Sequence, residues 1–389
     1  MQTKINRRFP PLATLLKEFE VQFKWLVTWI IFFSFRRSWR NYGDRLTSHG
    51  PLRVLILRYD RIGDMVVSLP TFHVLKQRLP QAQIDVLASP ANASIIESDS
   101  TINRVYQYRK DSALDVFRTF RTLARNRYDV IIDLVANVSA TSYMMLLWVG
   151  REAYKIGVHK NNNVRLYDYI VSPHRLVEAP AVQLHFAGLE PFGIDLEACH
   201  DPIGLQLSPE LIAWSDREIG ALRDSKSVGL VGINISAGKP NREWGERKYG
   251  ELVRQLSAHY PQLQFLLFCA PSDYEQATRI AAAAGDNVSL IQRGLSLLQV
   301  AALIRKLDCI LSPDTSIVHI AASLNVPLVA MYTAAETNYR RWRPYTEKSW
   351  IVRPPEGDSL HGITVEAYMI QIGSALRSLF KAAPTGEGN

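Results

Sequence analysis

Short runs of branched apolar residues recur along this chain, and amphipathic stretches separate them. In those stretches apolar side chains recur at helical spacing, every three or four positions, as at 249–256 and 297–304. Continuous apolar strands between helices are typical of parallel sheets covered on both faces. The pattern therefore predicts an α/β chain of doubly wound domains, with strands at 52–57, 84–88, 130–134, 228–235, 265–269, 288–291, 309–311 and 328–331.

The length of the chain and a proline-containing interruption in its pattern predict two such domains. The 389 residues, 47% of them hydrophobic, suffice for two cores. The boundary is expected within 177–207, where Pro180, Pro191 and Pro202 interrupt the pattern. We expect an N-terminal extension at 1–50, a first Rossmann-like domain at 51–195, a second at 205–360, and a C-terminal helix and tail at 361–389.

The net charge of +8 is concentrated at one end of the chain. The first 50 residues contain nine Lys or Arg and three acidic residues, so +6 belongs to the extension and +2 to everything else. A nucleic-acid groove needs basic charge spread over the folded body, so we expect no nucleic-acid partner. Three scattered cysteines favour a reducing compartment and exclude a disulfide framework.

The extension carries an apolar run at 25–35 that is followed at once by Arg36, Arg37 and Arg40. Eleven residues are too few to cross a bilayer, which takes about 20. Tryptophans next to arginines suit a helix that lies in the membrane interface. We therefore predict that residues 12–40 bind a membrane surface; the alternative is a helix packed on the body or on another subunit.

The first candidate site follows the first predicted strand of the body. Arg58, Arg61, Gly63 and Asp64 lie where that strand turns into a helix. In doubly wound sheets, ligands bind outside the carboxyl ends of strands. Asp64 is either a helix cap or a general base at a cleft, and the residues alone leave both interpretations open.

The second candidate site follows the strand at 309–311. Asp314, Thr315 and Ser316 precede or begin a helix, and free N–H groups at such a position bind phosphate. His319 lies one turn further along and is expected on the same face. The alternative is that Asp314 caps the helix and His319 is an interior histidine.

The third candidate site is the loop after the strand at 228–235. Ser236 and Gly238 let the backbone approach a phosphate, while Lys239 and Arg242 supply positive charge. The loop is not a Walker motif, and no GxGxxG follows a strand, which disfavours a dinucleotide oxidoreductase. The alternative is an ordinary solvated loop.

Together these segments resemble glycosyltransferase family 9, the ADP-heptose:lipopolysaccharide heptosyltransferases. Residues 62–70 match its Gly-Asp motif, Arg242-Glu243-Trp244 match its loop with a basic residue and a tryptophan, and 314–319 match its Asp-Thr-Gly-x-x-His element. The similarity runs in order over 52–350. Arg242 replaces the usual lysine of the family, and Ser316 replaces its usual glycine.

The resemblance implies a GT-B fold, with two Rossmann-like domains facing a cleft, and an inverting reaction without metal or other cofactor. Asp64 would be the catalytic base and Arg242 would neutralise the leaving diphosphate. The acceptor side would include Arg58, Arg61 and Gly63, and the donor side Ser236, Gly238, Lys239, Arg242, Asp314, Thr315, Ser316 and His319.

The expected reaction moves heptose from ADP-heptose onto lipopolysaccharide core or a related lipid-linked surface glycan. The expected location is the cytoplasm of a bacterium, at the inner membrane. Two alternatives are a GT-B transferase that uses another nucleotide sugar, and a noncatalytic glycan-binding or assembly protein with the same fold.

Overall fold

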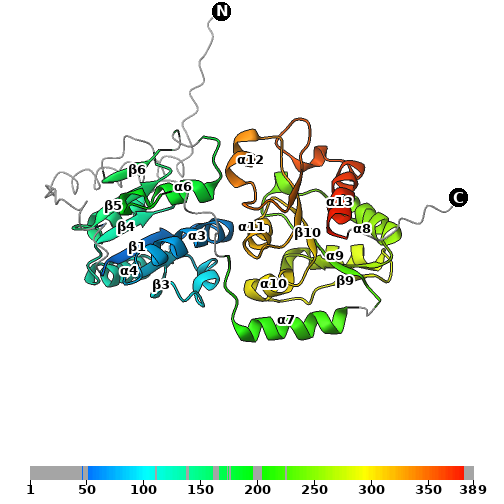
Figure 1. Cartoon of the computed structure of the whole chain (residues 1–389), viewed down its shortest axis with the longest axis horizontal. Helices are drawn as coiled ribbons and strands as arrows, with labels where there is room; N and C mark the ends of the chain where they lie inside the picture. Colours follow the sequence, from blue (N-terminus) through cyan, green and yellow to red (C-terminus); the bar gives the residue numbers. More distant parts are fainter. Residues whose placement is uncertain are drawn as a thin grey trace, which may run out of the picture.

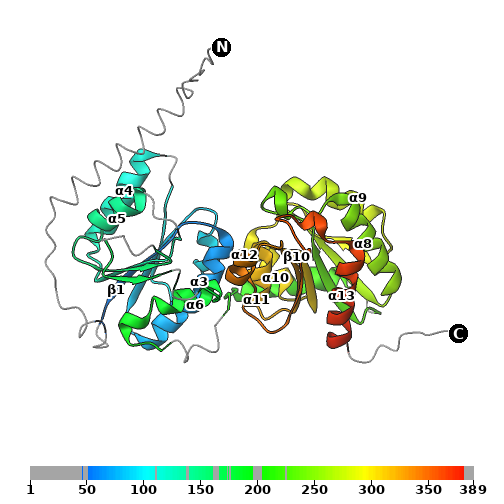
Figure 2. The ribbon, with the colours of Figure 1, turned by 90° about the horizontal axis from the view of Figure 1, so that it is seen from above.

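The computed structural model describes residues 46, 51–109, 112–136, 140–160, 166–172, 174, 177–195, 204–223 and 226–380. They form two α/β lobes that lie side by side (Figures 1 and 2). The predicted membrane-binding segment at 12–40 lies outside the described residues. Among the described helices, none has the length and apolar content needed to cross a membrane.

The first lobe is built on one parallel sheet with the strand order β3-β2-β1-β4-β5-β6. Its elements are β1 (Arg53–Arg58), α3 (Ile62–Arg78), β2 (Gln83–Ala88), η1 (Ala93–Ile96), β3 (Arg104–Gln107), α4 (Ala113–Arg125), β4 (Val130–Asp133), α5 (Ala140–Trp148), β5 (Tyr154–Val158), β6 (Tyr169–Val171), α6 (Ala181–Ala187) and η2 (Glu190–Phe192).

The second lobe is built on a parallel sheet with the order β12-β11-β10-β7-β8-β9. Its elements are α7 (Pro209–Leu222), β7 (Gly229–Asn234), η4 (Pro240–Arg242), α8 (Glu246–His259), β8 (Leu263–Phe268), η5 (Pro271–Asp273), α9 (Tyr274–Ala282), β9 (Val288–Leu290), α10 (Leu297–Ile304), β10 (Cys309–Pro313), α11 (Ser316–Ser323), β11 (Leu328–Met331), α12 (Glu336–Trp342), β12 (Ser349–Val352), η6 (Leu360–Gly362) and α13 (Val365–Leu379).

The two sheets repeat one topology. Counted within its own lobe, each sheet has the order 3-2-1-4-5-6, which is the doubly wound order of dinucleotide-binding folds. The connections reverse direction between β1 and β4 in the first lobe, and between β7 and β10 in the second. All eight predicted strands are confirmed, and β1, β7 and β10 place the three candidate segments at these switch points.

Helix α3 joins the lobes. Residues around its whole circumference are buried, as expected for a helix with neighbours on every side. It packs against α6 in its own lobe and against α11 in the other. Buried apolar residues of both lobes form one continuous cluster, so the lobes share a core.

Helix α13 belongs to the outer layer of the second lobe. Its apolar residues Tyr368, Ile372 and Leu376 are buried in the core of that lobe, and the helix packs against α8, β11 and β12. The sequence-based division at 361 set this helix apart, but its packing places it with the second sheet.

Candidate functional site

A cleft of about 760 Å³ lies between the lobes. The start of α3 forms one wall, and the loops after β7, β8 and β10 form the other. The prediction that the three segments share one cavity is confirmed, while the roles of their residues stay predictions. Eleven predicted site residues form about half of the wall: Arg61, Gly63, Asp64, Ser236, Gly238, Lys239, Arg242, Asp314, Thr315, Ser316 and His319.

Arg58 differs from the expectation that it would contact an acceptor, because it lies beneath the cleft with 1% exposure. Two acidic residues contact its guanidinium, Asp60 in the β1–α3 loop and Asp64 in the first turn of α3. The guanidinium lies 3.3 Å from Asp60 and 3.5 Å from the Asp64 carboxylate, and it donates to the carbonyl of Leu134. Its Nε donates to the Asp64 carbonyl at 2.9 Å. Arg58 therefore holds Asp64 from below.

His185, on α6, lies on the remaining side of Arg58. Its Nε2 is 3.4 Å from Nη2 of Arg58, which can only donate, so this nitrogen must be the acceptor. Burial, with the arginine charge adding to it, lowers the pKa of His185 well below its usual range. The imidazole is therefore neutral, so it accepts from Arg58 without adding a second positive charge beside it.

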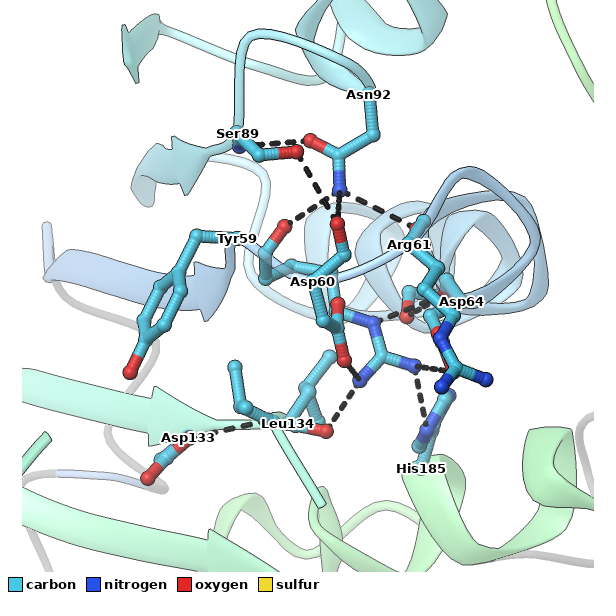
Figure 3. A network of polar contacts seen from close by, with 12 residues as sticks. Tyr59, Asp60, Arg61, Asp64, Ser89, Asn92, Asp133, Leu134 and His185 are labelled. Carbon is cyan, nitrogen blue, oxygen red and sulfur yellow. Dashed lines mark hydrogen bonds and ion pairs between the residues drawn. The ribbon is translucent and has the colours of Figure 1, made fainter. Parts of the chain in front are cut away.

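Asn92 fixes the loop that carries these groups. Its amide donates to the carbonyls of Arg58 at 3.0 Å and Arg61 at 3.3 Å, and its oxygen accepts from the backbone of Ser89 at 2.8 Å (Figure 3). The side chain is completely buried. A buried amide with both ends satisfied holds one loop conformation, because any other would leave polar groups unpaired.

Asp64 lies in the first turn of α3 and does not cap it. The N-cap position belongs to Arg61, and no side chain caps there. The Asp64 carboxylate is 13% exposed and lies in the cleft wall. The helix-cap interpretation of Asp64 is therefore wrong.

Asp314 forms a second aspartate–arginine pair on the opposite wall. Its carboxylate lies 2.8 Å from Nη2 of Arg242, whose Nη1 donates to the Asp314 carbonyl at 2.8 Å. Asn338, from α12, donates to the same carboxylate at 3.2 Å. Burial raises the pKa of Asp314, and the charge of Arg242 opposes that shift. The pair thus turns the guanidinium of Arg242 toward the start of α11.

Trp244 explains how a loop can hold Arg242 in place. The indole is 1% exposed, donates to the carbonyl of Ile363 at 2.9 Å, and meets Tyr249 and Tyr368 edge-on at centroid distances of 5.0 and 5.5 Å. Aromatic pairs of this geometry are favourable. The tryptophan that marks this motif is therefore an anchor in the core, two residues from the cleft.

The start of α11 is capped by Thr315, whose hydroxyl accepts from the backbone of Ile317 at 3.3 Å. The alternative that Asp314 is the cap is wrong. Asn234, at the end of β7, donates to Thr315 at 3.3 Å and to Ser312 at 3.0 Å. Sequence analysis missed Asn234, although its position at the end of a predicted strand was a usable signal.

His319 and Gly63 meet where the two helices are closest. A Cβ on Gly63 would lie 3.1 Å from Cδ2 of His319 and 3.6 Å from the Cα of Ser316, so glycine permits this approach. His319 is buried, and burial lowers its pKa against the opposing charges of Asp314 and Asp64. The imidazole is thus an interior group whose edge also lines the cleft.

Both apolar and cationic side chains line the cleft. Apolar residues at the end of β8, after β9 and on α10, among them Phe268, Ile291 and Val300, form one part of its wall. Burial raises the pKa of Cys269 there to about 11, so its thiol stays protonated. Lys239, in the loop after β7, is an exposed cationic residue of the wall. In the described part of the chain, no group of three or more His, Cys, Asp or Glu is arranged to hold a metal.

The sequence model of glycosyltransferase family 9 (heptosyltransferase) matches residues 116–361. The chain is 24% identical to lipopolysaccharide heptosyltransferase 3 of Escherichia coli K12 over 297 residues, covering 73% of this chain and 83% of the relative.

Two solved structures from E. coli share the fold. ADP-heptose LPS heptosyltransferase II superposes with a TM-score of 0.69 and 22% identity, covering 85% of this chain and all of that one. Heptosyltransferase WaaC with ADP superposes with a TM-score of 0.64 and 20% identity, covering 83% and all of that chain. The GT-B arrangement of two parallel-sheet lobes is therefore confirmed, and the chain belongs to glycosyltransferase family 9, the heptosyltransferases.

Proposed function

We propose that this glycosyltransferase moves heptose from ADP-heptose onto lipopolysaccharide core or a related lipid-linked glycan, with inversion at the anomeric carbon. One observation carries the proposal: Asp64 from the first lobe and the Arg242–Asp314 pair from the second line the same cleft. The names of relatives with the same fold, which include ADP and ADP-heptose, support the choice of donor.

The donor is proposed to lie along the second lobe. The apolar residues of the cleft wall suit a flat purine base, whose transfer from water to an apolar surface is favourable. The diphosphate would lie at the start of α11, where backbone N–H groups and the helix dipole attract anions. Lys239 and Arg242 flank that position, and Ser316 offers a hydroxyl at the first position of the helix.

Asp64 is proposed to act as the base. An acceptor hydroxyl would give its proton to the carboxylate while its oxygen attacks the anomeric carbon, and the bond from that carbon to the diphosphate would break. The negative charge that develops on the diphosphate would be stabilised by Lys239, Arg242 and the helix terminus, because preformed charges need no reorganisation. Arg58 would hold the Asp64 carboxylate in position without touching either substrate.

The deciding experiment incubates the full chain with ADP-heptose and purified lipopolysaccharide core acceptors, in a metal chelator, and reads product masses. We expect an acceptor heavier by one heptose, with ADP released. Thermal shift measurements with ADP, UDP and GDP then test which nucleotide the donor carries, and ADP should raise the unfolding temperature most.

Two outcomes would contradict this proposal, and each would favour a different function. Transfer from a different nucleotide sugar, with equal stabilisation by all three nucleotides, would favour another GT-B transferase. Binding of glycans without any product from a wide donor panel would favour the noncatalytic alternative. At the level of the cell, we propose action at the cytoplasmic face of the inner membrane, with residues 12–40 as one contact.

A further inference from the structure

Helices α4 and α5, which lie next to each other on the first lobe (Figure 2), expose an unusual amount of apolar surface. Leu114 is 56% exposed and Phe117 49%, while Met144 and Trp148 are each 41% exposed. Of the seven large apolar side chains exposed in the described residues, these four gather at one place. The rings of Phe117 and Trp148 are 5.4 Å apart, so the two helices present one continuous surface, here named the α4–α5 patch.

Arginines share the outer face of α4 with this apolar surface. Arg118, Arg121 and Arg125 are exposed and follow Leu114 and Phe117 at helical spacing. The helix contains three arginines and one acidic residue, a net charge of +2. The acidic residue lies 3.7 Å from Arg118 in an exposed pair, which leaves the field of the arginines largely uncompensated.

A column of aromatic rings connects the patch to Tyr59, at the start of the loop between β1 and α3. Phe120 lies under Trp148 with centroids 5.9 Å apart, Tyr108 follows at 6.5 Å, and Tyr59 at 5.0 Å from Tyr108. Tyr59 directly follows β1, and its hydroxyl is 2.6 Å from the Ser142 hydroxyl on α5. The patch is therefore rigidly connected to the loop that carries the Asp64 helix.

We propose that the α4–α5 patch docks this protein on an anionic lipid bilayer. Tryptophan and phenylalanine would enter at headgroup depth, and the arginines would bind lipid phosphates, which is the chemistry of interfacial helices. Arginines on the same helical face favour lipid over a second copy of the chain, because two such faces would repel each other. This surface is distinct from residues 12–40 and does not depend on the identity of the sugar donor.

The test uses the full chain and vesicles of phosphatidylethanolamine with phosphatidylglycerol, against vesicles of phosphatidylcholine alone. Hydrogen exchange should slow in α4 and α5 on the anionic vesicles only. Phe117→Ser with Trp148→Ser, and separately Arg118→Glu with Arg121→Glu, should each lower vesicle affinity about tenfold. Transfer to a deacylated, water-soluble acceptor should be unchanged in both variants, which separates this proposal from the assignment of the reaction.

Matched controls come from the other lobe. Val228→Ser with Ile370→Ser removes two apolar residues that are even more exposed than Phe117 and Trp148. Arg247→Glu with Arg254→Glu reverses two exposed charges on α8. Both control variants should bind vesicles like the unchanged protein. Unchanged exchange in α4 on vesicles, or wild-type affinity in the patch variants, would overturn the proposal. Equally slow hydrogen exchange in α4 with and without vesicles would also overturn the proposal. The patch would then be covered by another part of this chain or, if the exchange slows further as the protein concentration rises, by a second copy.

Discussion

The starts of α3 and α11 face each other across the cleft, and each carries an aspartate paired with an arginine, but the two arginines are held differently. Arg58 is 1% exposed and contacts Asp60, Leu134 and His185 besides Asp64. Arg242 is 16% exposed, and the polar contacts that its guanidinium makes in the described residues go to Asp314. The first arginine is part of the core, and the second is part of the cleft wall. The same two residue types thus stabilise the fold in one lobe and line the cleft in the other.

Asp64→Asn should have the largest effect on activity. The amide keeps the size of the side chain but cannot accept the proton, so kcat should fall by about 10²- to 10⁴-fold. Product formation measures this fall, while ADP binding and the thermal midpoint should stay near those of the unchanged protein. A variant with the original kcat would remove Asp64 from the chemistry.

Arg58→Met should mainly lower stability. It leaves Asp60 and Asp64 without their buried partner, which typically costs about 3–5 kcal/mol in the free energy of unfolding. Denaturant unfolding measures the loss. Arg61→Met, three residues away on the exposed surface, is the control and should change the free energy by less than about 0.5 kcal/mol. Equal effects in both variants would refute the core role of Arg58.

Arg242→Met should mainly lower activity. Loss of one charge that stabilises a developing anion typically costs about 10²- to 10³-fold in kcat. Arg242→Lys keeps the charge but loses the two-point contact to Asp314, so we expect an intermediate kcat. Steady-state kinetics with saturating donor distinguish the variants. If Arg242→Met lowered the free energy of unfolding by more than it raised the activation free energy calculated from kcat, the contrast with Arg58 would be refuted.

His319→Gln should have the smallest effect, seen in the dependence of stability on pH. Burial lowers the pKa of His319 in the folded protein, so below about pH 6.5 the unfolded chain takes up a proton that the folded chain does not. Stability must therefore fall as pH falls through that value, by at most about 1.4 kcal/mol per pH unit for each such proton. His159 and His185 shift in the same direction and remain in the variant.

Thermal unfolding between pH 5 and 8 should thus show a shallower slope in His319→Gln, not a flat one. His259→Gln, an exposed histidine on α8, serves as the control and should keep the original slope. An unchanged slope in His319→Gln would mean that His319 is protonated alike in the folded and unfolded chain.

The fold was predictable where strands are buried on both faces. The four missed strands lack that pattern: β3, β6 and β12 are edge strands and are partly exposed, and β5, next to an edge, contains Lys155 and Gly157. Strands of this kind carry mixed polarity, because one side faces solvent or a polar network. Periodicity alone does not separate them from loops. The edge strand β9 is also partly exposed, but its apolar sequence was enough to predict it.

The candidate site was predictable as a set of segments, but not as a network. Strand ends identified the regions that meet, because ligands bind at the carboxyl ends of parallel strands. The burial of Arg58 depends on Asn92 and His185, which are 34 and 127 residues away in the sequence. No local pattern reports such long-range contacts. The role of Trp244 was hidden for the same reason, since its partner carbonyl is 119 residues away.

The contact of Gly63 with His319 and Ser316 makes substitutions in one lobe depend on the residues of the other. With so little space between the helices, a bulkier residue on either side would require a compensating substitution on the other. In this chain the contact is matched to glycine at position 63 and serine at position 316. Its two halves should therefore exchange poorly with those of relatives in chimeric proteins.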